Sequence, residues 1–192
     1  MLRFLTKILN FIFYIFLFLY HLLLFYLFSF ICFSLFSSQE NVIKFFYFNY
    51  FVVASGSMKK ELNVNDFVIV RKISEKECSK LKKSTTLNSQ DGDIVIFKVD
   101  KDKFPMFPPD NYNIIHRVVD NNIKEKYITT KGDNNKTTYS YESKIPYKNI
   151  IAKYVFKIDS KYIFFMKCII VVVLCSLIIY FLVSKLQTLI EN

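Results

Sequence analysis

The stretch from Ile8 to Gln39 contains no Asp, Glu, Lys or Arg, and Ile8–Phe36 is almost continuously Phe, Leu, Ile and Tyr. A helix needs about 20 apolar residues to cross a bilayer, whereas the apolar core of a cleavable signal peptide has only about 7–15. A chain of 192 residues cannot bury a helix that is apolar on every side. The run therefore predicts a retained transmembrane anchor within an N-terminal segment, residues 1–39.

A second apolar run, Ile163–Val183, lies near the other end of the chain and is interrupted only by Lys167. This lysine is close to one end of the run, so its ammonium group can reach the lipid headgroups. The run predicts a second transmembrane helix with a short tail, residues 162–192. Two spans make a multi-pass membrane protein and leave residues 40–161 as a soluble domain.

The charges that flank the first run predict its orientation. Arg3 and Lys7 precede the run, and positive residues beside a span favour the cytoplasmic side. We therefore expect the N-terminus in the cytoplasm. The soluble domain, residues 40–161, is then extracytoplasmic or lumenal.

The soluble domain has the sequence pattern of a β protein. Short runs rich in β-branched and aromatic residues alternate with polar breaks and show no 3.6-residue periodicity. These runs are Phe45–Ala54, Phe67–Arg71, Ile94–Val99, Ile114–Val119, Tyr127–Thr130 and Ile150–Ile158. They predict a mainly β domain, either a barrel or a coiled sheet. The apolar stretch Phe45–Phe51 fits a core strand or a surface that dips into the membrane interface.

Two polar stretches interrupt the predicted strands. Lys72–Gln90 is expected to form a short surface helix or a loop. Lys101–Tyr112 contains three prolines, which exclude regular strand pairing there.

Composition excludes several functions. The net charge is +10, but the basic residues are scattered, so nucleic acid is not an expected partner. Cys78 is the only cysteine of the soluble domain, which therefore forms no internal disulfide. The chain has only 3 glycines, which excludes a Gly-rich phosphate-binding loop.

In a chain so poor in glycine, each glycine is expected where the backbone needs a positive φ or a close approach. All three glycines lie beside polar residues at the edges of predicted strands. Gly92, between two aspartates, fits an ordinary turn before a strand. Gly56 and Gly132 lie beside the only residues that can assemble a hydrolytic site.

Such a site needs a nucleophile, a general base, a group that orients the base, and hydrogen-bond donors for the oxyanion. Histidine suits the role of base near neutral pH. The chain has two histidines, and His21 lies inside the first apolar run. His116 is therefore the candidate base. Ser57, beside Gly56, is the candidate nucleophile.

Four motifs occur in order along the chain: SGSM at 55–58, GDIVIF at 92–97, IIHRVV at 114–119 and TKGDNN at 130–135. The series resembles the membrane-bound type I signal peptidases. Within them it is similar to the Ser/His branch, because His116 occupies the position where the commoner bacterial branch carries a lysine base. The resemblance covers residues of about 50–158 and implies an all-β domain of coiled sheets with a groove near the membrane surface.

The resemblance also implies roles for single residues. These are Ser57 as nucleophile, Ser55 as the hydroxyl that assists the oxyanion hole, Met58 as a packing residue beside the substrate groove, His116 as general base and Asp133 as the acid that orients His116 or holds its surroundings. The Ser/His branch often has a second acid a few positions after the GDNN motif, where this chain reads Lys136-Thr137-Thr138-Tyr139. Asp133 is therefore the preferred third member of a triad, and Glu142 is the alternative.

The function that this resemblance implies is removal of signal peptides from exported or secreted preproteins by a serine endopeptidase without metal or cofactor. Its partners are preprotein signal peptides and the lipid bilayer, and the resemblance also admits a protein translocon or accessory peptidase subunits. The expected location is the plasma membrane, with the endoplasmic reticulum membrane as the alternative. A second interpretation is a catalytically inactive, membrane-anchored β-domain that binds translocating chains or scaffolds a processing complex.

Overall fold

A computed structural model of the chain describes residues 2–100, 103–105, 113–165, 168, 171–172 and 175. The chain divides into two compact units, Met1–Asn49 and Tyr50–Asn192. The predicted second span, Ile163–Val183, lies largely outside the described residues, and so does most of the proline-bearing stretch Lys101–Tyr112.

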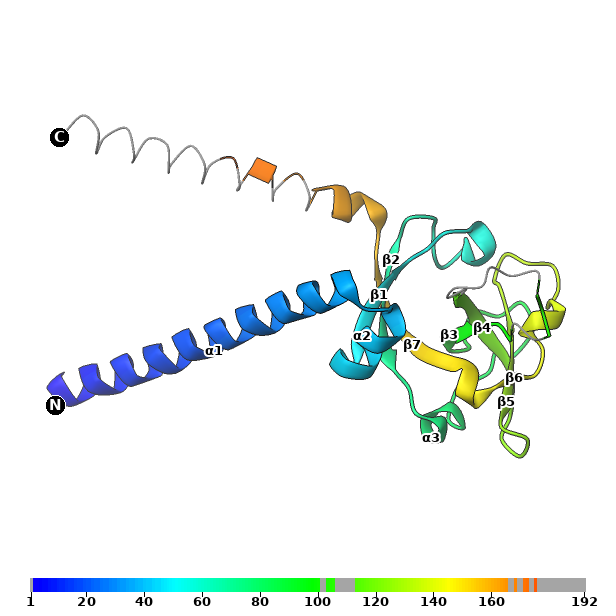
Figure 1. The fold of residues 1–192 in the computed structure, drawn as a ribbon, viewed down its shortest axis with the longest axis horizontal. Helices are drawn as coiled ribbons and strands as arrows, with labels where there is room; N and C mark the ends of the chain where they lie inside the picture. The colour runs from blue at the N-terminus through cyan, green and yellow to red at the C-terminus, as the bar shows by residue number, and fades with distance from the viewer. Residues whose placement is uncertain are drawn as a thin grey trace. The chain divides into compact units, whose positions relative to one another are not determined.

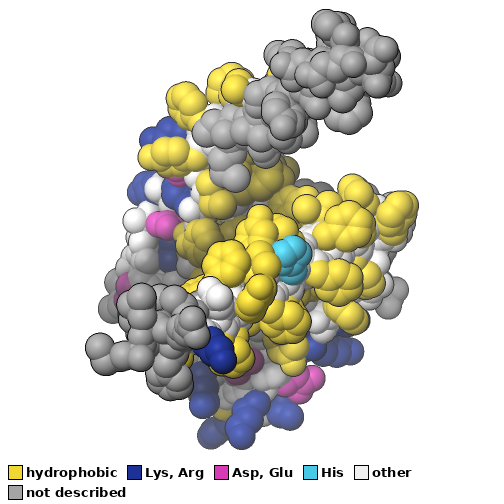
Figure 2. All heavy atoms as spheres, turned by 90° about the vertical axis from the view of Figure 1, so that its left-hand side faces the viewer, with side chains coloured by type: hydrophobic (Ala, Val, Ile, Leu, Met, Phe, Trp, Pro, Cys, Tyr) yellow, Lys and Arg dark blue, Asp and Glu magenta, His cyan; other side chains and the backbone are white. Residues whose placement is uncertain are grey.

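The expected apolar helix is present as α1, Leu2–Phe36. Its segment Asn10–Phe36 is long and apolar enough to cross a membrane, and no other helix in the described part of the chain is. Large hydrophobic side chains are exposed along it, up to 91% for Phe36. Figure 2 shows hydrophobic side chains over most of the described surface on one face of the molecule, with charged side chains mainly at its margins. The exposed apolar surface of α1 fits membrane association.

A short helix, α2 (Gln39–Phe46), follows α1. Ser38 caps its first turn by accepting a hydrogen bond from the Asn41 N–H at 3.4 Å. The helix ends at Tyr47, whose φ of 67° is the left-handed conformation that stops a helix. One face of α2 is apolar and buried, and consists of Val42, Ile43 and Phe46.

Helix α2 corrects the first predicted strand. The sequence predicts a strand over Phe45–Ala54, but Phe45 and Phe46 are the last residues of α2, and β1 covers only Phe48–Val52. The apolar side chains Val42, Ile43 and Phe46 recur at helical spacing, so they extend the helix into the aromatic run. Among these aromatic residues Phe46 is buried, while Phe45, Tyr47 and Phe48 are exposed.

Seven strands form one sheet in the order β1-β2-β7-β3-β4-β5-β6. From β2 to β6 in this order, neighbouring strands run antiparallel. The sheet curls into a half-barrel (Figure 1), so the fold is mainly β as predicted. The strands are β1 (Phe48–Val52), β2 (Phe67–Lys72), β3 (Ile94–Lys98), β4 (Asn113–Asn122), β5 (Tyr127–Lys131), β6 (Ile145–Pro146) and β7 (Ile150–Ile158).

Strand β7 joins the two halves of the sheet. It pairs with β2 on one edge and with β3 on the other. The pairing shifts register between Ile69 and Val70 in β2, and again between Ile96 and Phe97 in β3. Register shifts of this kind bend a strand and increase its twist. They allow one long strand to serve both halves of the coiled sheet.

The core lies inside the curve of the sheet. Strand β3 contributes most, because its first four residues are all buried. A central strand with both faces covered explains why Ile94–Phe97 reads as an unbroken apolar run. The core cluster consists of Ile73, Cys78, Leu81, Val95, Phe97, Val99, Ile114, Val118, Ile128, Ile145, Tyr147 and Ile150.

The remaining short elements connect the strands. The prediction of a short helix or loop over Lys72–Gln90 is confirmed, since α3 (Glu75–Cys78) is a single turn with a capping box between Ser74 and Glu77. Three 3₁₀ turns, η1 (Gly56–Met58), η2 (Ser140–Glu142) and η3 (Tyr147–Asn149), were not predicted. Neither was β6, because two residues are too short to show any period.

Candidate active site

Ser57 sits in the 3₁₀ turn η1, shortly after β1. The Lys59 N–H donates to the Gly56 carbonyl at 3.1 Å, and the Leu62 N–H donates to the Met58 carbonyl at 2.7 Å. These bonds hold the turn in place. The Ser57 side chain is half-buried, so its hydroxyl is held by the fold yet remains accessible.

His116 lies in β4, between β3 and β5, and only 4% of its surface is exposed. Its Nε2 lies 2.9 Å from the Ser57 Oγ, although the two residues are 59 positions apart in the chain. The structure therefore brings the candidate nucleophile and the candidate base within hydrogen-bond distance.

The other ring nitrogen of His116 bonds Glu142. The Nδ1–H donates to Oε1 of Glu142, which lies at the end of η2 and is fully buried. The second oxygen, Oε2, accepts the Tyr139 N–H at 2.8 Å. Because a carboxylate only accepts hydrogen bonds, this contact places a proton on Nδ1 and leaves Nε2 free to accept one from Ser57.

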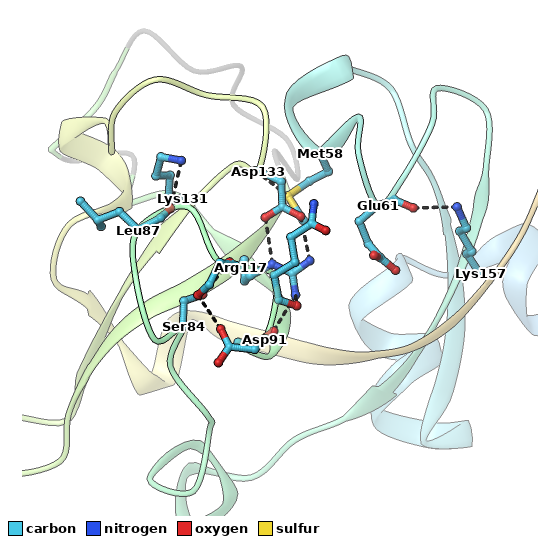
Figure 3. Close-up of polar contacts among 12 residues, drawn as sticks. Met58, Glu61, Ser84, Leu87, Asp91, Arg117, Lys131, Asp133 and Lys157 are labelled. Carbon is cyan, nitrogen blue, oxygen red and sulfur yellow. Dashed lines mark hydrogen bonds and ion pairs between the residues drawn. The ribbon is translucent and has the colours of Figure 1, made fainter.

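Asp133 does not contact the His116 ring, so the prediction that it orients this ring is wrong. Its carboxylate instead faces Arg117, with Oδ1 2.9 Å from Nε and Oδ2 2.7 Å from Nη2 (Figure 3). His116 and Arg117 are consecutive in a strand, so their side chains point to opposite faces of the sheet. Glu142, the alternative third member of the triad, is the acid that bonds the His116 ring. The other role expected of Asp133, to hold the surroundings of His116, fits this ion pair.

The Arg117–Asp133 ion pair is buried, with both side chains only 5% exposed. The Arg117 Nη1 also donates to the carbonyls of Gln90 at 2.9 Å and Gly92 at 2.7 Å. Burial lowers the pKa of Arg117, but the hydrogen bonds and charge of Asp133, together with the charges of Glu61 and Asp91, outweigh that effect, and the net pKa lies above its ordinary value. Arg117 thus remains charged and ties β4 to the loop before β3. No role was predicted for this residue from the sequence.

The loop that carries the TKGDNN motif closes over the Ser57 turn. The Asn134 N–H donates to the Ser57 carbonyl at 2.8 Å. A methyl group added at Gly132 would lie 2.8 Å from that carbonyl oxygen and 2.9 Å from His116 Nε2. Gly132 is therefore required for close approach, and its φ is not positive. Gly92, predicted in an ordinary turn before a strand, is also a close-approach glycine, because a methyl group added there would lie 2.6 Å from the Val118 carbonyl oxygen, and its φ is not positive.

The other two predicted residues lie beside Ser57. The Ser55 Oγ is 3.2 Å from the Ser57 Oγ. Met58 is completely buried, and its sulfur accepts the Asp133 N–H at 3.3 Å. Figure 3 shows Met58 next to Asp133, so Met58 packs the Ser57 turn against the motif loop.

A cavity of about 360 Å³ opens at this site, and Ser57 and His116 are part of its lining. Two chain segments, 51–54 and 113–116, contribute to the lining. The remaining lining residues are Ser55, Met58, Ile96, Asn135, Tyr139 and Tyr141. Apolar walls beside a few convergent polar groups are typical of a substrate site.

The arrangement has the parts that acyl transfer through a serine ester needs: a hydroxyl, an imidazole within reach of it, and a buried carboxylate behind the imidazole. Within the described ranges, no group of three or more His, Cys, Asp or Glu side chains is arranged to hold a metal ion.

Comparison with known proteins places the chain in a family. The family model described as "Signal peptidase, peptidase S26" matches residues 19–150, which is more than half of the chain. The matched region contains Ser57, His116, Asp133 and Glu142, and it takes in every strand from β1 to β6. Among curated proteins no match was found.

Proposed function

We propose that this chain, which belongs to the signal peptidase family, peptidase S26, is a membrane-bound serine endopeptidase that removes signal peptides from exported or secreted preproteins. Membership supports signal-peptide removal by a serine peptidase in general. The finer proposal, a Ser/His mechanism, rests on one observation. Ser57, His116 and Glu142 form a continuous hydrogen-bonded row that ends in the substrate cavity.

In this mechanism the Ser57 oxygen attacks the carbonyl carbon of the scissile peptide bond while His116 Nε2 takes the hydroxyl proton. The carbon–nitrogen bond then breaks, and the imidazolium gives that proton to the leaving amine. The signal peptide remains as an ester on Ser57. A water molecule, deprotonated by His116, hydrolyses the ester and restores the hydroxyl. Glu142 stabilises the imidazolium and holds its tautomer.

The oxyanion needs donors near Ser57. We assign the Ser57 N–H and the Ser55 hydroxyl, whose oxygen lies 3.2 Å from the Ser57 Oγ. Loss of a single such donor typically costs about 3–4 kcal/mol of transition-state stabilisation. Ser55→Ala is therefore expected to lower kcat more than it changes KM.

The cavity supports recognition of an extended peptide. Residues 51–52 of β1 and 113–116 of β4 are extended backbone, and a substrate strand aligned with either can form main-chain hydrogen bonds. Ile96, Ile114 and Met58 line the same space with apolar side chains. We propose that these walls admit small side chains beside the scissile bond and exclude large ones.

Anchoring by α1 gives this activity a physical advantage. A preprotein held in the same bilayer meets the site at a high effective concentration. We place the catalytic domain on the extracytoplasmic or lumenal side, in a plasma membrane or endoplasmic reticulum membrane. A C-terminal span and association with a translocon or accessory subunits complete the proposal.

The proposal is tested with the full-length chain, reconstituted in vesicles, and a preprotein substrate. Ser57→Ala should lower the cleavage rate by about 10⁴-fold or more. Ser79→Ala is the matched control, because the Ser79 hydroxyl only bonds the Lys76 carbonyl on α3. Normal cleavage by Ser57→Ala would contradict the Ser/His mechanism. No cleavage by the unchanged chain would leave an inactive scaffold domain as the explanation of the fold.

A further inference from the structure

Helix α2 folds back along the last turns of α1, as Figure 1 shows. The Phe46 ring lies 5.4 Å from the Tyr26 ring, 5.2 Å from that of Phe30 and 5.7 Å from that of Phe33. Tyr26 lies ten residues before the end of α1 at Phe36, which corresponds to about 15 Å at the helical rise of 1.5 Å per residue. The two helices therefore form a hairpin, residues 26–46, in which the Phe46 side chain at the end of α2 reaches the Tyr26 ring.

The outward face of α2 is polar. Glu40 and Lys44 form an ion pair of 2.9 Å, with 31% and 60% of their side-chain surfaces exposed. Gln39 and Asn41 are exposed as well. Charged and amide groups are costly in hydrocarbon, where no water solvates them. A helix with this outward face belongs at the level of the lipid headgroups or above it.

These two observations set a limit on how deep α1 enters the bilayer. We propose that the hydrocarbon core ends near Tyr26, and that the 26–46 hairpin is a collar which rests on the headgroup region of the bilayer. The inference builds on the membrane anchoring in the proposed function, and it replaces a span of Ile8–Phe36 by one of Ile8–Phe25.

The shortened span still crosses a membrane. Ile8–Phe25 extends over about 27 Å as an α-helix, and its length lies inside the range of 17–25 residues found for spans. It matches a bilayer at the thin end of the natural range without tilting. Aromatic side chains that the collar leaves exposed, Phe36, Phe45 and Tyr47, suit the interface between lipid and water.

Depth can be measured with nitroxide spin labels on single cysteines. Four native cysteines, at 32, 78, 168 and 175, are first replaced by serine in the full-length chain. Phe18→Cys and Phe28→Cys form a matched pair, because both side chains are 65% exposed and only lipid can shield them. Phe36→Cys reports the end of the helix. The variants are reconstituted in phosphatidylcholine vesicles and exposed to a water-soluble nickel complex.

The collar predicts that nickel reaches labels at positions 28 and 36 but not at position 18. Shielding of position 28 equal to that of position 18, with position 36 accessible, would overturn the collar and keep the anchor. Nickel access at position 18 would overturn the anchor itself. Preprotein cleavage by the same preparations is recorded separately, so failure of the collar is distinguished from failure of the proposed function.

A second variant tests whether the charges of α2 keep the hairpin at the level of the headgroups. Glu40→Leu combined with Lys44→Leu removes the charges of α2, which should let the hairpin sink and lower nickel access at position 28 severalfold. Lys124→Leu combined with Glu125→Leu makes the same change on the exposed β4–β5 turn and should leave that access unchanged. Unchanged access in the Glu40 and Lys44 variant would contradict the role given to the polarity of α2.

Discussion

Glu142 accepts a hydrogen bond from Nδ1 of His116 where solvent does not reach, since Glu142 is fully buried and His116 is 4% exposed. The Tyr139 N–H holds the other carboxylate oxygen at 2.8 Å. The carboxylate is thus fixed from two sides. It fixes in turn the tautomer and the direction of the imidazole that meets Ser57.

Glu142→Gln is expected to lower kcat by about 10³–10⁴-fold, because the amide keeps the shape of the side chain but supports neither the tautomer nor the imidazolium. Steady-state cleavage of a preprotein measures kcat and KM, and KM should change little. Glu75→Gln, on the exposed first turn of α3, serves as the control. A kcat equal to that of the unchanged chain would remove Glu142 from the mechanism.

Asp133→Asn should act on stability first. The change leaves the Arg117 guanidinium buried without its counter-charge, which costs about 3–5 kcal/mol when one partner of a buried pair is removed. Denaturant unfolding of the full-length chain measures this loss. Replacing both partners with apolar residues, Arg117→Met with Asp133→Leu, should restore part of the free energy of unfolding.

The roles of Glu142 and Asp133 are distinguished by whether kcat or the free energy of unfolding changes. We expect Glu142→Gln to lower kcat with a small effect on the free energy of unfolding. Asp133→Asn should lower the free energy of unfolding, with a small effect on kcat in the fraction that stays folded. A larger loss of kcat in Asp133→Asn than in Glu142→Gln would reverse our assignment.

Two glycines of the site should respond differently to alanine. A Cβ at Gly132 would lie 2.9 Å from His116 Nε2, whereas a Cβ at Gly56 has only the Lys59 Cδ near it, at 3.8 Å. Because a misplacement of about 1 Å at a reacting group can cost about 10²-fold in rate, Gly132→Ala should lose at least that much activity. Gly56→Ala should stay active. Preprotein cleavage checks both, and equal activity of the two variants would contradict the close approach.

Cys78 should be chemically inert in the folded protein. Burial raises the pKa of its thiol to about 11, and the charges of Glu75 and Glu77 add to this effect. Because the raised pKa favours the protonated form, the thiolate fraction at pH 8 is about 100-fold smaller than for an ordinary thiol. Iodoacetamide should modify Cys78 only after denaturation, as peptide mass spectrometry can show. Equal alkylation before and after denaturation would contradict the burial.

Much of the site could be predicted because its parts lie within ordered motifs. Ser57 follows a short strand, and His116 lies inside one, so the local sequence was enough to predict both positions. Glu142 was harder to assign, because it lies beyond the motif in a polar stretch and reaches His116 only through the turn η2. Neighbouring side chains in β4 point to opposite faces of the sheet, so an acid that pairs with Arg117 cannot also contact His116. This alternation was the available signal.

The fold, like the site, was predicted only in part. Long strands with clear composition were predicted closely, and β7 has the predicted bounds Ile150–Ile158. Helix α2 was missed because aromatic residues favour strands locally, while its helical form depends on Phe46 packing against α1. The helical spacing of Val42, Ile43 and Phe46 was the local signal for this helix, and the aromatic run that follows obscured it.

The central claim is that Ser57 and His116 act as one unit, joined by the 2.9 Å contact between Oγ and Nε2. The most direct measurement compares preprotein cleavage by Ser57→Ala, by His116→Ala and by the double variant, each reconstituted in vesicles. Residues that act as a unit are strongly non-additive, so the account predicts that all three variants share one low residual rate. A normal rate for either single variant, or losses that multiply in the double variant, would contradict it.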